Sequence, residues 1–100
     1  MTLEYLVTIN VPPAIEGSVV DCLLMLEVEH GFSSFPVSAH HHLNEGLTLA
    51  EQVTGRQKEI RFQIYVSKSG LHTLITQLRQ EFSGAGLHYW VLPLADSGVI

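Results

Sequence analysis

Histidines gather in the middle of the chain, where three follow one another at the point where a predicted strand runs into a loop. They are His40, His41 and His42. In an extended strand, His40 and His42 point to one side and His41 to the other. The two residues on the shared side have their roots about 7 Å apart, so both imidazoles can bind one zinc or copper ion. The spacing therefore makes His40 and His42 candidate metal ligands.

A metal site of this kind needs more ligands than the pair provides. Glu45, His30, His88 or a neighbouring subunit are the candidates to add them. The competing interpretation is that the histidines are solvated or hydrogen-bonded polar residues at an exposed strand end, or that they contact another ligand. Because structural zinc requires four ligands, we favour a structural or ligand-contacting role over a metal site.

A basic cluster follows the histidines and consists of Arg56, Lys58 and Arg61. Basic side chains beside a loop that contains glycine, here Gly55, are suited to hold a phosphate or a carboxylate. The alternative is that they pair across strands with nearby acids such as Glu51 and Glu59. The residue types alone leave both interpretations open.

Hydrophobic periodicity defines the elements that must position these residues. Alternation predicts strands over residues 3–11, 32–42, 60–66 and 87–94, and helical spacing predicts helices over 14–29 and 69–83. A loop over 44–58 contains a predicted short helical turn at 49–54. The order β-α-β-β-α-β predicts a single α+β domain over 1–100, with a ferredoxin-like antiparallel sheet and both helices on one face. The first and third strands are then central, and Pro36 suits the second strand to an edge.

The sheet face away from the helices is also predicted to be apolar. In the last strand Trp90 and Leu92 alternate with Tyr89 and Val91. In the first strand Leu6 points to the side opposite to that of its neighbours. Of the 100 residues, 46% are hydrophobic and only 15% are charged, which is apolar for so small a domain. We therefore expect subunits to associate sheet to sheet, which would cover this face.

Charge and composition exclude several classes of function. The net charge of −5 disfavours nucleic acid as a partner, so Tyr65 and Trp90 are interpreted as sheet-packing residues. A signal peptide and a bilayer-spanning apolar run are both absent, so membrane insertion is not expected. The lone Cys22 fits a reducing compartment, and we expect the protein in the cytoplasm. A nucleophile elbow, a phosphate-binding GxxxxGK[ST] loop and a CxxC pair are missing, so an enzyme is not expected.

The order and lengths of the elements resemble the PII signalling superfamily, including PII-like proteins and CutA. The segment from Ala39-His40 to Glu51-Gln52-Val53-Thr54-Gly55-Arg56-Gln57 more specifically resembles a family of bacterial PII-like proteins often encoded beside heavy-metal efflux pumps. This resemblance implies a homotrimer with inward-facing sheets, a loop after the second strand that acts on a membrane transporter, and ligands bound in subunit clefts near the loop base. The candidate ligand-binding residues are then His40, Glu51, Gly55, Arg56 and Lys58.

Two departures from the PII pattern bear on the ligand. The segment between the second helix and the last strand, Glu81-Phe82-Ser83-Gly84-Ala85-Gly86, is short and acidic where typical PII proteins carry a basic nucleotide loop. The loop over 44–58 also contains no tyrosine to modify. Both departures argue against ATP binding and uridylylation. The sequence leaves the cofactor open, with a divalent metal as one option.

Overall fold

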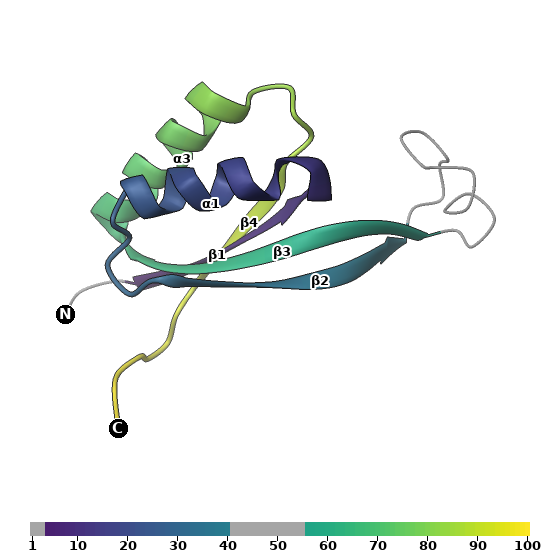
Figure 1. The fold of residues 1–100 in the computed structure, drawn as a ribbon. Coiled ribbons are helices and arrows are strands. Elements are labelled where there is room, and N and C mark those ends of the chain that lie inside the picture. The colour runs from purple at the N-terminus through teal and green to yellow at the C-terminus, as the bar shows by residue number, and fades with distance from the viewer. Residues whose placement is uncertain (1–3, 41–55) are drawn as a thin grey trace.

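One antiparallel sheet with two helices on a single face makes up the described part of the chain (Figure 1). The computed structural model describes residues 4–40 and 56–100. Its strands are β1 (Glu4–Val11), β2 (Phe32–His40), β3 (Arg56–Ser67) and β4 (His88–Pro93). Its helices are the 3-10 turn η1 (Pro13–Ile15), α1 (Glu16–Met25) and α3 (Lys68–Phe82). The strand order β2-β3-β1-β4 confirms the predicted ferredoxin-like fold, with β2 and its Pro36 at an edge.

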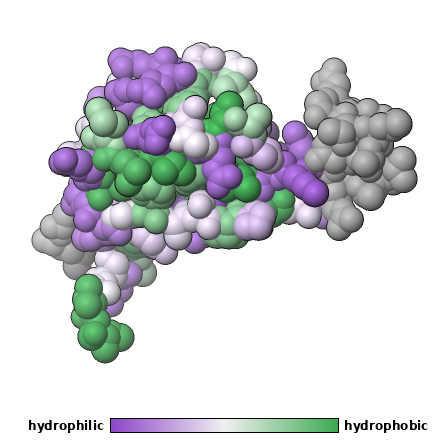
Figure 2. Space-filling view, viewed as in Figure 1, coloured by the Kyte–Doolittle hydropathy of each residue, from purple (hydrophilic) through white to green (hydrophobic). Residues whose placement is uncertain are grey.

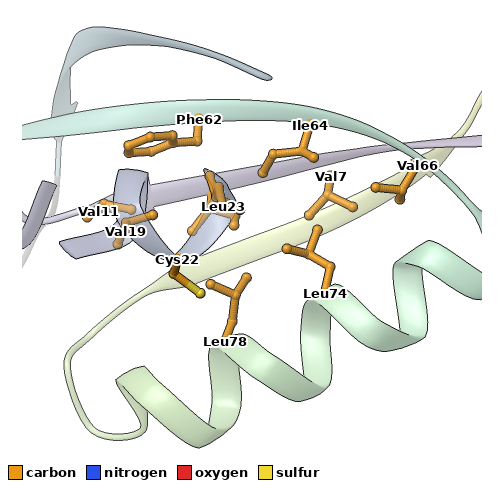
Figure 3. Packing of buried hydrophobic residues seen from close by; sticks show 11 residues of the cluster. Val7, Val11, Val19, Cys22, Leu23, Phe62, Ile64, Val66, Leu74 and Leu78 are labelled. Atoms are coloured by element: carbon orange, nitrogen blue, oxygen red, sulfur yellow. The ribbon is translucent and has the colours of Figure 1, made fainter. Parts of the chain in front are cut away.

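The hydrophobic core lies between the sheet and the two helices. The central strands provide its floor, because Val7 pairs with Ile64 and Ile9 with Phe62, so that all four side chains share the helix-facing side. Figure 3 shows Val7, Phe62 and Ile64 directed toward α1 and α3. The core consists of Val7, Ile9, Val11, Val19, Cys22, Leu23, Phe62, Ile64, Val66, Leu74 and Leu78.

The helix α3 follows its sequence pattern closely. It begins after Ser67, whose Oγ accepts a hydrogen bond from the Gly70 amide at 3.2 Å and so caps the first turn. Leu74 and Leu78 are buried, and Leu71, Ile75 and Phe82 pack partly buried around them. The predicted apolar stripe is therefore the face that packs on the sheet. No helix in the described ranges is long and apolar enough to cross a membrane.

The helix α1 is shorter than predicted. It ends at Met25 rather than near Glu29, because Glu27 takes a left-handed conformation with φ 49° and ends the helix before Gly31 is reached. Helical spacing in the sequence also predicts that Leu24, Met25 and Val28 widen the apolar stripe of this helix. This prediction is wrong for Leu24 and Met25, which are 61% and 84% exposed, whereas Val28 packs partly buried against the core. The sheet covers only one side of α1, and Val19, Cys22 and Leu23 occupy that side.

The strand β3 is longer than predicted and begins at Arg56 rather than at Ile60. Its first residues pair with the end of β2, and together they form a two-stranded ribbon that extends beyond the helices (Figure 1). Neither side of this ribbon is covered by a helix, so residues 56–59 need no apolar alternation. The strand therefore could not be recognised from hydrophobic periodicity.

Candidate functional site

The sheet face opposite the helices, hereafter the open face, carries a mixture of aromatic, aliphatic and charged side chains. Strand pairing places on it Leu6, Thr8, Asn10, Ser33, Phe35, Val37, Glu59, Arg61, Gln63, Tyr65, His88, Trp90 and Leu92. Four large apolar members are substantially exposed: Phe35 by 41%, Tyr65 by 37%, Trp90 by 40% and Leu92 by 52%. Such a collection on one face is typical of a surface that another molecule covers.

Arg61 occupies the middle of the open face and is held there by two neighbours. Its Nε donates a hydrogen bond to Asn10 Oδ1 at 2.8 Å, and its guanidinium carbon lies 5.2 Å from the centre of the Trp90 ring. Asn10 itself is nearly buried, with 9% of its surface exposed. The guanidinium is thus fixed in orientation on a face that mixes apolar and polar side chains, and a fixed orientation favours anion binding.

This arrangement separates the basic residues that the sequence analysis grouped together. Arg61 faces the open side, whereas Lys58 is an odd number of residues away along β3 and belongs to the opposite side. Arg56, Lys58 and Arg61 are therefore not one cluster. The partners of Arg61, Asn10 and Trp90, were missed because their proximity depends on strand register across three strands, which residue types do not reveal.

Three of the predicted ligand-binding positions meet at the end of the ribbon. In the β2–β3 ladder His40 stands opposite Arg56, and Ser38 stands opposite Lys58. The side chains of His40 and Lys58 are exposed. The remaining predicted residues, Glu51, Gly55 and the second histidine of the metal pair, His42, lie outside the described residues.

The additional metal ligands considered for His40 do not lie near it where they are described. His30 precedes β2 and His40 ends it, so the strand separates them by roughly 30 Å. His88 lies on β4, at the edge of the sheet opposite to β2, where it pairs with Asn10 of β1. Within residues 4–40 and 56–100, no group of three or more His, Cys, Asp or Glu side chains is placed to hold a metal ion.

His30 instead belongs to a polar contact at the far end of the sheet. Its Nε2 lies 3.5 Å from Glu4 Oε1, an ion pair when the imidazole is protonated. The other carboxylate oxygen of Glu4 accepts a hydrogen bond from Ser97 Oγ. The contact therefore joins β1, the connection after α1 and the segment that follows β4.

A small apolar pocket lies beneath the end of α3. Ile9, Leu78 and Phe82 contribute to its lining, and its volume is about 180 Å³. Arg79 stands at its edge, where Nη2 donates to Tyr89 Oη at 2.8 Å. In the single chain its volume is below the roughly 300–1,000 Å³ that is usual for ligand pockets. Ser83, Gly84 and Gly86, from the segment between α3 and β4, also line it.

The fold and the open face together define the class of protein. The architecture is that of PII-like and CutA proteins, as comparison with solved structures shows. The chain belongs to the family described as protein of unknown function DUF3240, whose model matches residues 1–100. No curated protein sequence matches the chain.

Three solved structures illustrate the similarity. A DUF3240 family protein from Shewanella baltica OS155 is 22% identical, with a TM-score of 0.80 and 100% of this chain and 99% of that chain covered. CutA from Synechococcus elongatus PCC7942, complexed with Bis-Tris, is 16% identical, with a TM-score of 0.73 and coverages of 99% and 87%. The PII-like protein CPII from Thiomonas intermedia K12, bound to ADP, AMP and bicarbonate, is 16% identical, with a TM-score of 0.69 and coverages of 100% and 98%.

Proposed function

We propose that the chain is a non-enzymatic PII-like regulatory protein of the cytoplasm. In this proposal it forms a trimer through its open face, senses a small ligand or a metal, and acts on a membrane transporter through the segment after β2. The observation that carries the proposal is the β2–β3 ribbon, which places His40 and Arg56, the residues flanking that segment, beyond the helices (Figure 1). An extension of this kind suits contact with a partner while the sheet is occupied by other subunits.

Charge at the ribbon end favours an anion as the ligand. Arg56 and Lys58 are both basic and lie two residues apart on β3, with Arg56 opposite His40 in the ladder. A cation bound there would be repelled by them, whereas a phosphate or carboxylate would be attracted. CPII was solved with ADP, AMP and bicarbonate, and the anionic character of those molecules supports testing similar compounds here.

A thermal-shift measurement tests the ligand. We expect phosphate or bicarbonate to raise the melting temperature of the protein by mass action, and an adenine nucleotide to raise it no more than phosphate does. Replacing Lys58 with alanine should reduce this shift. The matched control is Lys68→Ala, since Lys68 is an exposed lysine at the start of α3 and far from the ribbon end. Equal ligand-induced shifts of the melting temperature in the two variants would show that the ligand does not bind at the ribbon end.

The alternative function is that of a metal-binding protein, which buffers or delivers zinc or copper through His40 and His42. The observation in its favour is that His40 is exposed at the end of β2, two residues before His42. Calorimetric titration of Zn²⁺ into the wild type and into His40→Ala/His42→Ala decides between the two functions. Heat of binding that the double substitution leaves unchanged would exclude these histidines as metal ligands.

A further inference from the structure

The segment after β4, residues 94–100 and hereafter the tail, is fixed at its root to the start of β1. The Leu94 amide donates to the Glu4 carbonyl at 3.0 Å, and Ser97 Oγ donates to the Glu4 carboxylate. The same carboxylate faces His30. Because both backbone and side-chain contacts hold the tail at this end of the sheet, the direction in which it leaves the domain is set by the fold.

Beyond that root, the tail carries side chains that its own domain does not cover. Val99 is 103% and Ile100 125% exposed, and Asp96 is exposed as well. The tail runs away from the helices toward the side of the open face (Figure 1), and its tip forms a hydrophobic surface (Figure 2). An anchored segment that presents branched aliphatic side chains in this way is suited to bind a second molecule.

The open face offers a surface of matching chemistry. Arg61 supplies a fixed positive charge, and Phe35 and Trp90 supply half-exposed aromatic surface around it. The tail supplies a carboxylate at Asp96 and an aliphatic side chain at Val99, which an extended chain separates by about 10 Å. The two surfaces therefore complement each other in charge and in apolar character.

The tail cannot reach Arg61 of its own domain. Leu94 is bonded to Glu4, and Asp96 extends at most about 7 Å from there. Arg61 pairs with Asn10, which lies roughly 20 Å from Glu4 along β1. If Asp96 and Arg61 meet, they must therefore belong to different copies of the chain, whereas Val99 lies close enough to line a pocket with Tyr65 of its own domain.

We propose that the tail of one subunit lies across the open face of its neighbour, where Asp96 binds Arg61 and Val99 packs on the surrounding aromatic side chains. This inference rests on the proposed trimer and names the segment that holds it together. It also gives the fixed guanidinium of Arg61 a partner of opposite charge. The tail is thus an arm between subunits.

Charge reversal tests the arm. Sedimentation equilibrium is measured for the wild type, Asp96→Lys, Arg61→Glu and the double variant. Each single change should raise the protomer concentration at which the trimer half-dissociates by about tenfold or more, and the double variant should restore most of the loss. The control is Asp21→Lys, because Asp21 is exposed on α1 and should leave the equilibrium unchanged.

The outcomes separate this inference from the trimer itself. A wild type that is monomeric at micromolar concentration overturns both. A trimeric wild type in which Asp96→Lys behaves like Asp21→Lys, or in which the double variant is no better than Arg61→Glu, overturns the arm alone. Should Arg61→Glu fail to fold, Asp96→Lys and Val99→Ser still decide, since both residues are exposed in their own domain. Unchanged trimer affinity in these two variants would refute the arm.

Discussion

At the scale of single residues, Cys22 shows how burial determines reactivity. Burial, together with the charge of Glu81 and its side-chain hydrogen bond, raises the pKa of the Cys22 thiol from 9.0 to about 11. At pH 8 the reactive thiolate is then only about 0.1% of the total, roughly a hundredfold less than for a thiol with the ordinary value. We therefore expect Cys22 to react very slowly with a maleimide or with a disulfide reagent.

The measurement is the labelling rate at pH 8 in buffer and in denaturing urea, followed by mass. Labelling should accelerate strongly on unfolding, because the thiol then regains its ordinary pKa. Since the folded-state pKa is the higher one, the stabilising contribution of the protonated thiol is present below pH 9 and is lost as the pH rises toward 11. Rapid labelling of the folded protein would contradict the buried position of Cys22.

Arg61 shows which part of the candidate site a sequence can reveal. Its residue type indicated an anion-binding role, but its nearness in sequence to Lys58 suggested the wrong neighbours. A strand sends alternate residues to opposite faces, and only the register with β1 and β4 brings Asn10 and Trp90 to the guanidinium. Local pattern therefore identified the residue, while long-range pairing determined its surroundings.

At the scale of elements, the start of α3 depends on one side chain. Ser67 Oγ accepts from the Gly70 amide and donates to Glu29 Oε1 at 2.6 Å, so it both caps the helix and ties it to the connection after α1. Ser67→Ala should lower the free energy of unfolding by about 1 kcal/mol, the usual contribution of a helix cap. Urea denaturation at fixed protomer concentration measures it.

The neighbouring Ser69 provides the control for the cap. It is exposed within the first turn of α3 and lies 3.3 Å from Ser67 Oγ, but it does not accept from the Gly70 amide. Ser69→Ala should change stability by less than about 0.5 kcal/mol. Equal losses in the two variants would mean that the cap is not what stabilises this end of the helix.

Two glycines around α1 should respond to alanine in opposite directions. Gly17 lies in the helix with no other atom within 4 Å of an added Cβ, whereas Gly31 has a left-handed φ of 71°. Gly17→Ala should stabilise the protein by about 0.5 kcal/mol, because the unfolded chain loses freedom. Gly31→Ala should destabilise it by about 1 kcal/mol, because a side chain disfavours that conformation. Thermal unfolding of both variants tests the pair, and shifts of the same sign would contradict it.

The elements that sequence predicted best are those with one covered face. In α3, and in β1 and the middle of β3, apolar residues recur at the period of the element because the core selects them. The early start of β3 was missed because no helix covers the ribbon, so residues 56–59 carry no apolar alternation. The early end of α1 was missed for a different reason: Leu26 and Val28 continue the apolar pattern and pack against the core, although Glu27 has already left the helix.

At the scale of the whole molecule, the domain has one side on which the helices pack and an open face through which we propose that subunits associate. Leu92 on β4 and Leu24 on α1 are the same residue type, exposed by 52% and 61% in the single chain. If exposure alone determined where subunits associate, replacing either leucine with aspartate would weaken the association equally. In a trimer formed through the open face, only Leu92 is buried between subunits.

We therefore expect Leu92→Asp to weaken or abolish the trimer and Leu24→Asp to leave it intact. A carboxylate carries a large desolvation cost when it is buried without a partner, but it costs nothing comparable on a helix surface that remains in water. Sedimentation equilibrium gives the oligomeric state, and circular dichroism establishes that both variants keep the fold. The reverse result, with Leu24→Asp dissociating the assembly, would move the interface from the sheet to α1 and leave Phe35, Tyr65 and Trp90 exposed to solvent.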